Sequence, residues 1–292
     1  MLSRQMSRAH VHTNCRVVGV GSRASGTAIS ALGFDLDGTV YLGSELLPGA
    51  ADLISALADA GVPYLFVTNN SSKTGEQYVA NLLRLGLPAS RSSVLTSNDV
   101  AIAHLHRSGV RRPFLVATPA VRQEFRDHGF EPVEDQPDAV LITFDTTLDY
   151  AKLSRATGYI RAGLPYFATN PDLTCPTPQG PVPDCGSFAA LFAAATGVQP
   201  VVLGKPEALM AEALQARLGV QADGIAFVGD RLYTDVRMAR ENGFQAVLTL
   251  TGEARREDLV ASQYAPDLVF DDLRGLHAHL ERLGTLPSSA RG

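Results

Sequence analysis

Short apolar runs alternate with longer amphipathic segments along most of the chain. The runs are of strand length, and the segments between them carry apolar residues at helical spacing. This alternation is typical of parallel sheets whose strands are joined by crossover helices. It predicts strands at 29–34, 64–70, 114–118, 139–144, 165–169, 201–206, 224–229 and 245–250, and helices at 48–60, 74–85, 100–106, 120–128, 150–162, 188–196, 207–218 and up to 242.

The order of these elements predicts the α/β fold class with two parts. A Rossmann-like parallel-sheet core is expected from residues 28–96 together with 198–286, and a second α/β domain, residues 97–197, is inserted into it. Residues 1–27 and 287–292 are expected to be tails outside both domains.

The first 27 residues are rich in arginine and serine and contain no Asp or Glu. That composition fits an organellar transit peptide, a disordered tail or a start codon assigned too far upstream. The stretch VVGVGSRASG at 17–26 resembles a glycine-rich nucleotide loop, but a dinucleotide site needs a helix to open on the last glycine. A predicted strand follows instead, so this interpretation is rejected.

Composition excludes several classes of protein. The 292 residues carry a net charge of −5, which gives no basic surface for nucleic acid or an acidic membrane, and no apolar run is long enough to span a bilayer. The three cysteines, Cys15, Cys175 and Cys185, form no CxxC pair, which favours a reducing, cytoplasmic compartment without disulfides or zinc. The histidine pairs within 104–106 and 277–279 lack further ligands at metal-binding spacing and are interpreted as helix side chains.

Polar side chains follow four of the apolar runs. In open parallel sheets, ligands bind outside the carboxyl ends of the strands. Carboxylates gathered there would repel one another unless a divalent cation such as Mg²⁺ lay between them, and the ammonium, hydroxyl and amide groups would remain to hold an anion. Metal, anion and carboxylate together indicate phosphoryl transfer to an aspartate. The residues are Asp35 and Asp37, then Thr68, Asn69 and Asn70, then Lys205, then Asp230 and Asp235.

Taken singly, each of these groups has a structural explanation as a turn or a helix cap. Taken together, DLDGT at 35–39, FVTNNSSKT at 66–74, GKP at 204–206 and GDRLYTD at 229–235 resemble the four ordered motifs of the haloacid dehalogenase (HAD) superfamily. DGTVYLG, TNNSSKT and TNPD are further similar to NagD-like, type II-A capped phosphatases, relatives of p-nitrophenyl, phosphoglycolate and pyridoxal phosphatases. The resemblance covers nearly the whole chain from Ala28.

The resemblance implies a role for each catalytic and metal-binding position. Asp35 would be the nucleophile, forming an aspartyl-phosphate, and a Mg²⁺ ligand. Asp37 would act as general acid and base, with its backbone carbonyl on the metal. Lys205 would neutralise charge on Asp35 and on the phosphate. Asp230 would bind Mg²⁺ directly, and Asp235 would orient that shell.

The same resemblance implies the substrate contacts. Thr68 and the amide of Asn69, with Asn70 beside them, would bind the phosphoryl oxygens. The insert would be a cap that closes over the site, and Asp172 of the TNPD stretch would contribute to specificity.

One departure from the family pattern lies near the mouth of the expected site. The chain has PDCGS at 183–187 where the family usually has PGAGS, so that Asp184 and Cys185 replace small residues. This substitution puts the substrate class in doubt and could favour a smaller or more cationic substrate. The alternative is that both side chains face solvent.

These observations predict a Mg²⁺-dependent phosphatase that hydrolyses a small phosphomonoester: a sugar, glycerol, glycolate, nucleotide or pyridoxal phosphate. The second carboxylate, Asp37, favours this chemistry because an alkoxide leaving group needs a proton. A phosphomutase or a non-catalytic binder of a phosphorylated metabolite remains an alternative. The expected partner is that metabolite, and a homodimer is a tendency of the family.

Overall fold

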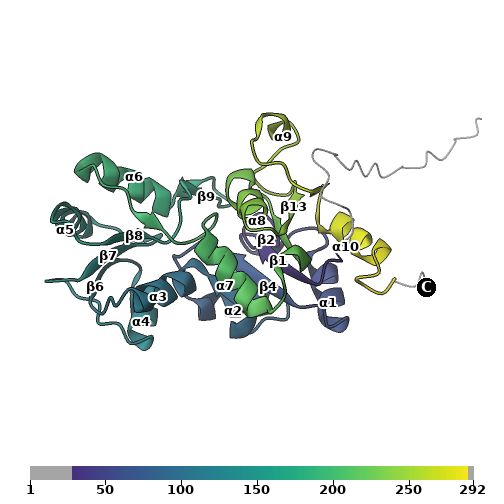
Figure 1. Ribbon diagram of the computed structural model, residues 1–292, viewed down its shortest axis with the longest axis horizontal. Helices are drawn as coiled ribbons and strands as arrows, with labels where there is room; N and C mark the ends of the chain where they lie inside the picture. Colours follow the sequence, from purple (N-terminus) through teal and green to yellow (C-terminus); the bar gives the residue numbers. More distant parts are fainter. Residues whose placement is uncertain (1–27, 289–292) are drawn as a thin grey trace, which may run out of the picture.

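The computed structural model describes residues 28–288. The predictions made for residues 1–27, including the glycine-rich stretch and Cys15, lie outside this range, as does the chain end after residue 288. Within it the predicted α/β class is confirmed: parallel sheets are flanked by helices (Figure 1).

The larger sheet has six strands, all of them parallel. The run of apolar residues along each strand fits a sheet that is covered on both faces. The strands, in spatial order, are β14 (Leu268–Phe270), β13 (Gln245–Thr249), β12 (Ile225–Gly229), β1 (Ala31–Asp35), β4 (Tyr64–Thr68) and β5 (Val94–Thr96).

The smaller sheet has four parallel strands. In spatial order they are β11 (Val201–Val202), β8 (Tyr166–Ala168), β7 (Ala139–Ile142) and β6 (Pro113–Val116). Two short antiparallel hairpins complete the strands: β2 (Tyr41–Leu42) with β3 (Glu45–Leu46), and β9 (Thr174–Cys175) with β10 (Val182–Pro183).

The strand predicted at 201–206 is wrong in length and in place. Only Val201 and Val202 form a strand, and they pair with Phe167 and Ala168 in the smaller sheet. The reason is that the chain is still leaving the smaller sheet at this point, and Leu203 donates its backbone N–H to Ala168. Lys205 therefore reaches the larger sheet from a connecting turn and not from a strand of that sheet.

The first five helices in chain order are α1 (Ala50–Asp59), α2 (Gly75–Arg84), α3 (Ser97–Arg107), α4 (Pro119–Asp127) and α5 (Tyr150–Arg161). They continue with α6 (Cys185–Thr196), α7 (Ala208–Leu218), α8 (Arg237–Glu241), α9 (Asp258–Ala261) and α10 (Leu273–Arg282). Two helices start earlier than predicted because their N-caps lie upstream: Thr96 and Asp99 form a capping box at α3, and Asp184 caps α6. The strands at 94–96 and 268–270 and the helix at 273–282 were not predicted.

Each face of the larger sheet packs on a different set of helices. Successive residues of a strand point to opposite faces, so Phe66 of β4 packs toward α1, α2 and α10, whereas Leu65 and Val67 pack toward α3, α7 and α8. The hydrophobic cluster that contains Leu65 and Val67 also includes Leu141 and Phe167 of the smaller sheet. The two sheets therefore share one hydrophobic core through α3 and α7, although residues 97–197 were predicted as a separate insert. The domain boundaries themselves stay a prediction.

A third cluster fills the other face of the smaller sheet, beneath α5 and α6. Figure 1 shows this sheet and its two helices at one end of an elongated molecule, with α1 and α10 at the other end. Over residues 28–288, no helix combines the length and the apolar character needed to cross a membrane.

Candidate active site

The candidate site lies at the carboxyl edge of the larger sheet, where three adjacent strands end. Asp35 is the last residue of β1, Asp230 follows β12, and Thr68 is the last residue of β4. These strands are neighbours in the sheet, so the side chains that follow them converge. Asp235 joins them from a single π-helical turn, Leu232–Val236, directly after Arg231.

Lys205 lies between two of the carboxylates. Its Nζ is 2.5 Å from Asp35 Oδ1 and 2.7 Å from Asp235 Oδ1, and only 2% of the residue is exposed. The two carboxylates raise the pKa of Lys205 in spite of its burial, so the ammonium stays charged.

The backbone of Lys205 is held by Asn69. The side-chain oxygen Oδ1 of Asn69 accepts a hydrogen bond from Lys205 N at 2.8 Å, and its Nδ2 donates to Lys205 O at 2.9 Å. The motif that follows β4 thus positions the lysine of the next motif. These two hydrogen bonds position Lys205, which was expected to project from a strand.

Asp35, Asp230 and Asp235 form a cluster that could hold a metal ion. One carboxylate oxygen of each lies within 4.8 Å of those of the other two. Burial and the charge of Asp235 raise the pKa of Asp230 to about 7 against the attraction of Arg231. Burial raises the pKa of Asp35 well above its usual value against the attraction of Lys205.

The hydrogen bonds around this cluster leave one buried oxygen without a partner. Asp230 Oδ2 accepts from Glu253 N at 2.7 Å, but Asp230 Oδ1 accepts no hydrogen bond from any group within residues 28–288. Both oxygens of Asp235 are already used, by Lys205 Nζ and by the backbone N–H of Arg231. A divalent cation fits this donor set, with Asp230 Oδ1 as a direct ligand and Asp235 as an orienting group.

Asp37 lies beside the cluster but outside it. Its half-buried side chain lines the same cavity as Asp35. Burial raises its pKa to about 6, while the positive charges of Lys73, Arg231 and Lys205 act in the opposite direction. A carboxyl group with this pKa can hold or release a proton close to neutral pH.

The cavity between the larger sheet and the β9–β10 hairpin is small, about 20 Å³. It brings together eight of the residues singled out in the sequence, and Asp230 and Asp235 lie beside it. The structure adds Cys175, Pro176, Arg231 and Thr234 to its wall. The residues singled out in the sequence that line it are Asp35, Asp37, Thr68, Asn69, Asn70, Asp172, Asp184 and Lys205.

Thr68 and Asn70 are tied to each other and to the hairpin. The backbone N–H of Asn70 donates to Thr68 Oγ1 at 3.1 Å, and Asn70 Nδ2 lies 3.4 Å from Cys175 Sγ. Thr68 is buried and Asn70 is half-buried. The two residues therefore form the wall of the cavity that continues from β4.

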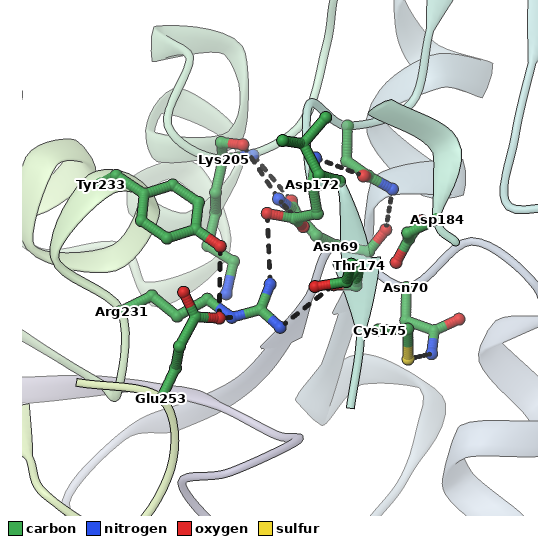
Figure 2. A network of polar contacts seen from close by, with 12 residues as sticks. Asn69, Asn70, Asp172, Thr174, Cys175, Asp184, Lys205, Arg231, Tyr233 and Glu253 are labelled. Carbon is green, nitrogen blue, oxygen red and sulfur yellow. Dashed lines mark hydrogen bonds and ion pairs between the residues drawn. The ribbon is translucent and has the colours of Figure 1, made fainter. Parts of the chain in front are cut away.

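Asp172, which was expected to contact substrate, is occupied by protein groups. Asn69 Nδ2 donates to its Oδ2 at 2.9 Å, and Arg231 forms an ion pair with its Oδ1 at 3.2 Å without the alignment of a hydrogen bond. Arg231 also pairs with Glu253 at 3.1 Å and donates to Thr174 O at 3.4 Å (Figure 2). Arg231 was not among the predicted site residues, although it directly follows Asp230 in the GDRLYTD motif.

Asp184 and Cys185 do not face solvent, so that alternative is wrong. Asp184 is 3% exposed and lines the cavity, and Cys185 is fully buried against the smaller sheet. Asp184 Oδ1 accepts from Cys185 N at 2.5 Å, which caps α6.

The histidines at 104 and 106 pack their rings against Phe167 and Phe130.

Comparison with known proteins identifies the family. A family model described as haloacid dehalogenase-like hydrolase matches residues 32–131, and a second, HAD-hydrolase-like model matches residues 202–276. The chain is 32% identical over 240 residues to 5'-nucleotidase YutF of Bacillus subtilis, an alignment that covers 82% of this chain and 94% of that protein. The chain belongs to the HAD-like hydrolase family.

Other relatives place this HAD-like hydrolase in the NagD-like branch. Acid sugar phosphatase of Staphylococcus epidermidis is 32% identical over 253 residues, covering 85% of this chain and 96% of the relative. The crystal structure of 4-nitrophenylphosphatase from Thermotoga maritima superposes with a TM-score of 0.82 at 39% identity, covering 86% of this chain and 97% of that one. A structure described as a putative NagD protein has a TM-score of 0.80 at 37% identity and covers 86% of this chain and 98% of that chain.

Proposed function

We propose that the protein is a Mg²⁺-dependent phosphatase that hydrolyses a small phosphomonoester through an aspartyl-phosphate on Asp35. The observation that carries this proposal is the pairing of Asp35 with Lys205 inside a cluster of three buried carboxylates, with Asp37 in the same cavity. The names of the relatives support it, since they are a 5'-nucleotidase, an acid sugar phosphatase and a 4-nitrophenylphosphatase.

The first step is attack of a carboxylate oxygen of Asp35 on phosphorus. The bond between phosphorus and the leaving oxygen breaks, and Asp37 donates its proton to that oxygen. Lys205 compensates the negative charge of Asp35 and of the phosphoryl group as they approach. Thr68 and the backbone amide of Asn69 bind the phosphoryl oxygens from the β4 side of the cavity.

The second step regenerates the enzyme. Asp37, now a carboxylate, takes a proton from water, and the oxygen of that water attacks phosphorus. The bond from phosphorus to Asp35 breaks, which releases orthophosphate and restores the carboxylate. The raised pKa of Asp37, about 6, suits a group that must give and take a proton in one cycle.

Asp35, Asp230 and the backbone carbonyl of Asp37 would hold the Mg²⁺ ion, and Asp235 would orient these ligands. When bound, the ion supplies positive charge that keeps the carboxylates ionised and stabilises charge on the phosphoryl oxygens. The cluster is suited to this because burial and neighbouring carboxylates raise the pKa of Asp35 and of Asp230, and because no donor within residues 28–288 bonds Asp230 Oδ1.

The test is hydrolysis of p-nitrophenyl phosphate with Mg²⁺ and with EDTA. We expect turnover that depends on Mg²⁺ and is lost in Asp35→Asn, while Asp59→Asn, an exposed residue at the end of α1, keeps the wild-type rate. Turnover that survives in Asp35→Asn would remove Asp35 as the nucleophile. Binding of phosphomonoesters without turnover of any would favour the non-catalytic binder, and transfer of the phosphoryl group to a second hydroxyl of the substrate would favour the phosphomutase.

The homodimer and the cytoplasmic location stay predictions from the sequence.

A further inference from the structure

The candidate cavity has two chemically different sides. The side formed by the larger sheet carries Asp35, Asp37 and Lys205, where a phosphoryl group would react. The opposite side is formed by the segment around the β9–β10 hairpin and carries Cys175 and Asp184. A phosphomonoester held by Lys205 would direct its leaving group toward this second side.

Most charges on the second side are already compensated within the protein. The guanidinium of Arg231 pairs with Asp172 and with Glu253, and Asn69 donates to the other oxygen of Asp172 (Figure 2). Neither Arg231 nor Asp172 is therefore available to a ligand without breaking these contacts.

Asp184 is the exception. Among residues 28–288 it forms no ion pair, and its hydrogen-bonding neighbours are neutral: the backbone N–H of Cys185 and the side-chain amide of Asn170. Only 3% of the residue is exposed. Burial and the nearby Asp172 raise the pKa of Asp184 to about 7, although the charge of Arg231 and the two hydrogen bonds act in the opposite direction.

Capping of α6 does not explain this charge. Asn and Ser satisfy a helix N-terminus about as well as Asp, and neither requires a buried carboxylate without a counter-ion. Helix α4 of the same region is capped by Thr118, and α5 is capped by Asp149, which is exposed to solvent. A buried aspartate at Asp184 is therefore costly unless a bound ligand uses it.

We infer that Asp184 binds a cationic group on the leaving group, so that the favoured substrates are small phosphomonoesters that carry a primary ammonium, such as phosphorylated amino alcohols or amino sugars. This inference rests on the proposed phosphatase function. An ammonium forms a charge-assisted hydrogen bond with a carboxylate, which a hydroxyl at the same position does not match.

The experiment measures kcat/KM for two pairs of substrates that differ only by an ammonium or a hydroxyl. The pairs are phosphoethanolamine with 2-hydroxyethyl phosphate, and glucosamine 6-phosphate with glucose 6-phosphate, which place the ammonium at different distances from phosphorus. For the wild type we expect the ammonium substrate of at least one pair to be favoured about tenfold or more. In Asp184→Asn, which keeps the size and the capping ability, that ratio is expected to fall to about one.

Asp149→Asn is the matched control, because it makes the same change at the N-cap of α5 and should leave the ratio unchanged. A wild-type ratio near one for both pairs, or a preference that Asp184→Asn retains, would overturn the inference. Hydrolysis of p-nitrophenyl phosphate separates this failure from failure of the proposed function. If that substrate is turned over but neither pair shows a preference, the phosphatase proposal stands and only the role of Asp184 is refuted. If no phosphomonoester is hydrolysed, both proposals fail.

Discussion

Arg231 forms an ion pair at 3.2 Å with Asp172 that joins the two sheets across the candidate cavity. Arg231 follows β12 of the larger sheet, and Asp172 lies in the loop after β8 of the smaller sheet. Both side chains are almost fully buried, so that the pair is shielded from solvent and salt. The arginine thus holds the hairpin loop against the carboxyl edge of the larger sheet.

Removal of one member of this pair should destabilise the protein more than removal of both. Arg231→Gln leaves Asp172 buried without a cation, and we expect a loss of about 3 kcal/mol in the free energy of unfolding. The double variant Arg231→Gln/Asp172→Asn should be more stable than Arg231→Gln alone, as measured by urea denaturation. Strictly additive losses would show that the two side chains do not interact.

Lys205 should be needed most at alkaline pH. In Lys205→Gln the carboxylates of Asp35 and Asp235 lose their shared cation, so the pKa of Asp35, already raised by burial, rises further and the folded protein binds more protons. Without added metal, we expect the variant to be less stable than the wild type at pH 8 and to recover much of the difference at pH 5. Lys152→Gln, which breaks a pair with Asp145 at 2.6 Å outside the cavity, should retain the catalytic rate. A loss in Lys205→Gln that is equal at both pH values would contradict this account.

Gly252 provides the space in which Asp230 lies. A Cβ atom at this position would be 1.9 Å from Asp230 Oδ2, so Gly252→Ala must displace that carboxylate. We expect the Mg²⁺ concentration for half-maximal activity to rise about tenfold or more. Gly158→Ala is the control, since its Cβ would meet no atom within 4 Å and alanine favours the helix α5. An unchanged Mg²⁺ requirement in Gly252→Ala would argue against Asp230 as a ligand.

Asp37 should matter less for a leaving group that needs no proton. We expect Asp37→Asn to reduce kcat/KM for an alkyl phosphate by about 10²–10⁴, and to reduce the phosphorylation step with p-nitrophenyl phosphate by much less, because p-nitrophenolate is a stable anion. Rapid mixing should then show a burst of p-nitrophenolate of about one equivalent, since the second step still lacks its base. Equal losses for both substrates without a burst would exclude Asp37 as the general acid.

Much of the candidate site could be predicted from the sequence because parallel strands end at one edge of a sheet. Asp35, Thr68 and Asp230 each follow an apolar run, so placing them together needed only the α/β pattern. Lys205 was correctly predicted to reach this cavity, but it was wrongly predicted to follow a strand of the larger sheet. The apolar pair Val201 and Val202 is too short to show which of two parallel sheets it joins.

The rest of the site depends on contacts between residues far apart in the sequence. Nothing near Asp172 indicates that Arg231 and Asn69 would occupy its carboxylate. Nothing near Asp184 indicates burial either, because an aspartate before a helix is normally exposed. Tertiary packing decides both, through the way in which the hairpin loop folds over the cavity.

Asp184 should make the stability of the folded protein depend on pH. Its pKa is raised to about 7 by burial and by Asp172, so between its unfolded value of about 4 and this folded value the native state binds more protons than the unfolded state. The stabilisation that comes from Asp184 is therefore complete below about pH 4 and is lost as the pH rises through 7. Urea denaturation between pH 5 and 8 should show a free energy of unfolding that falls more steeply with pH in the wild type than in Asp184→Asn, since an amide has no proton to lose. Asp149→Asn should keep the wild-type slope, and an Asp184→Asn curve parallel to the wild type would show that Asp184 titrates in the folded protein as it does in the unfolded chain.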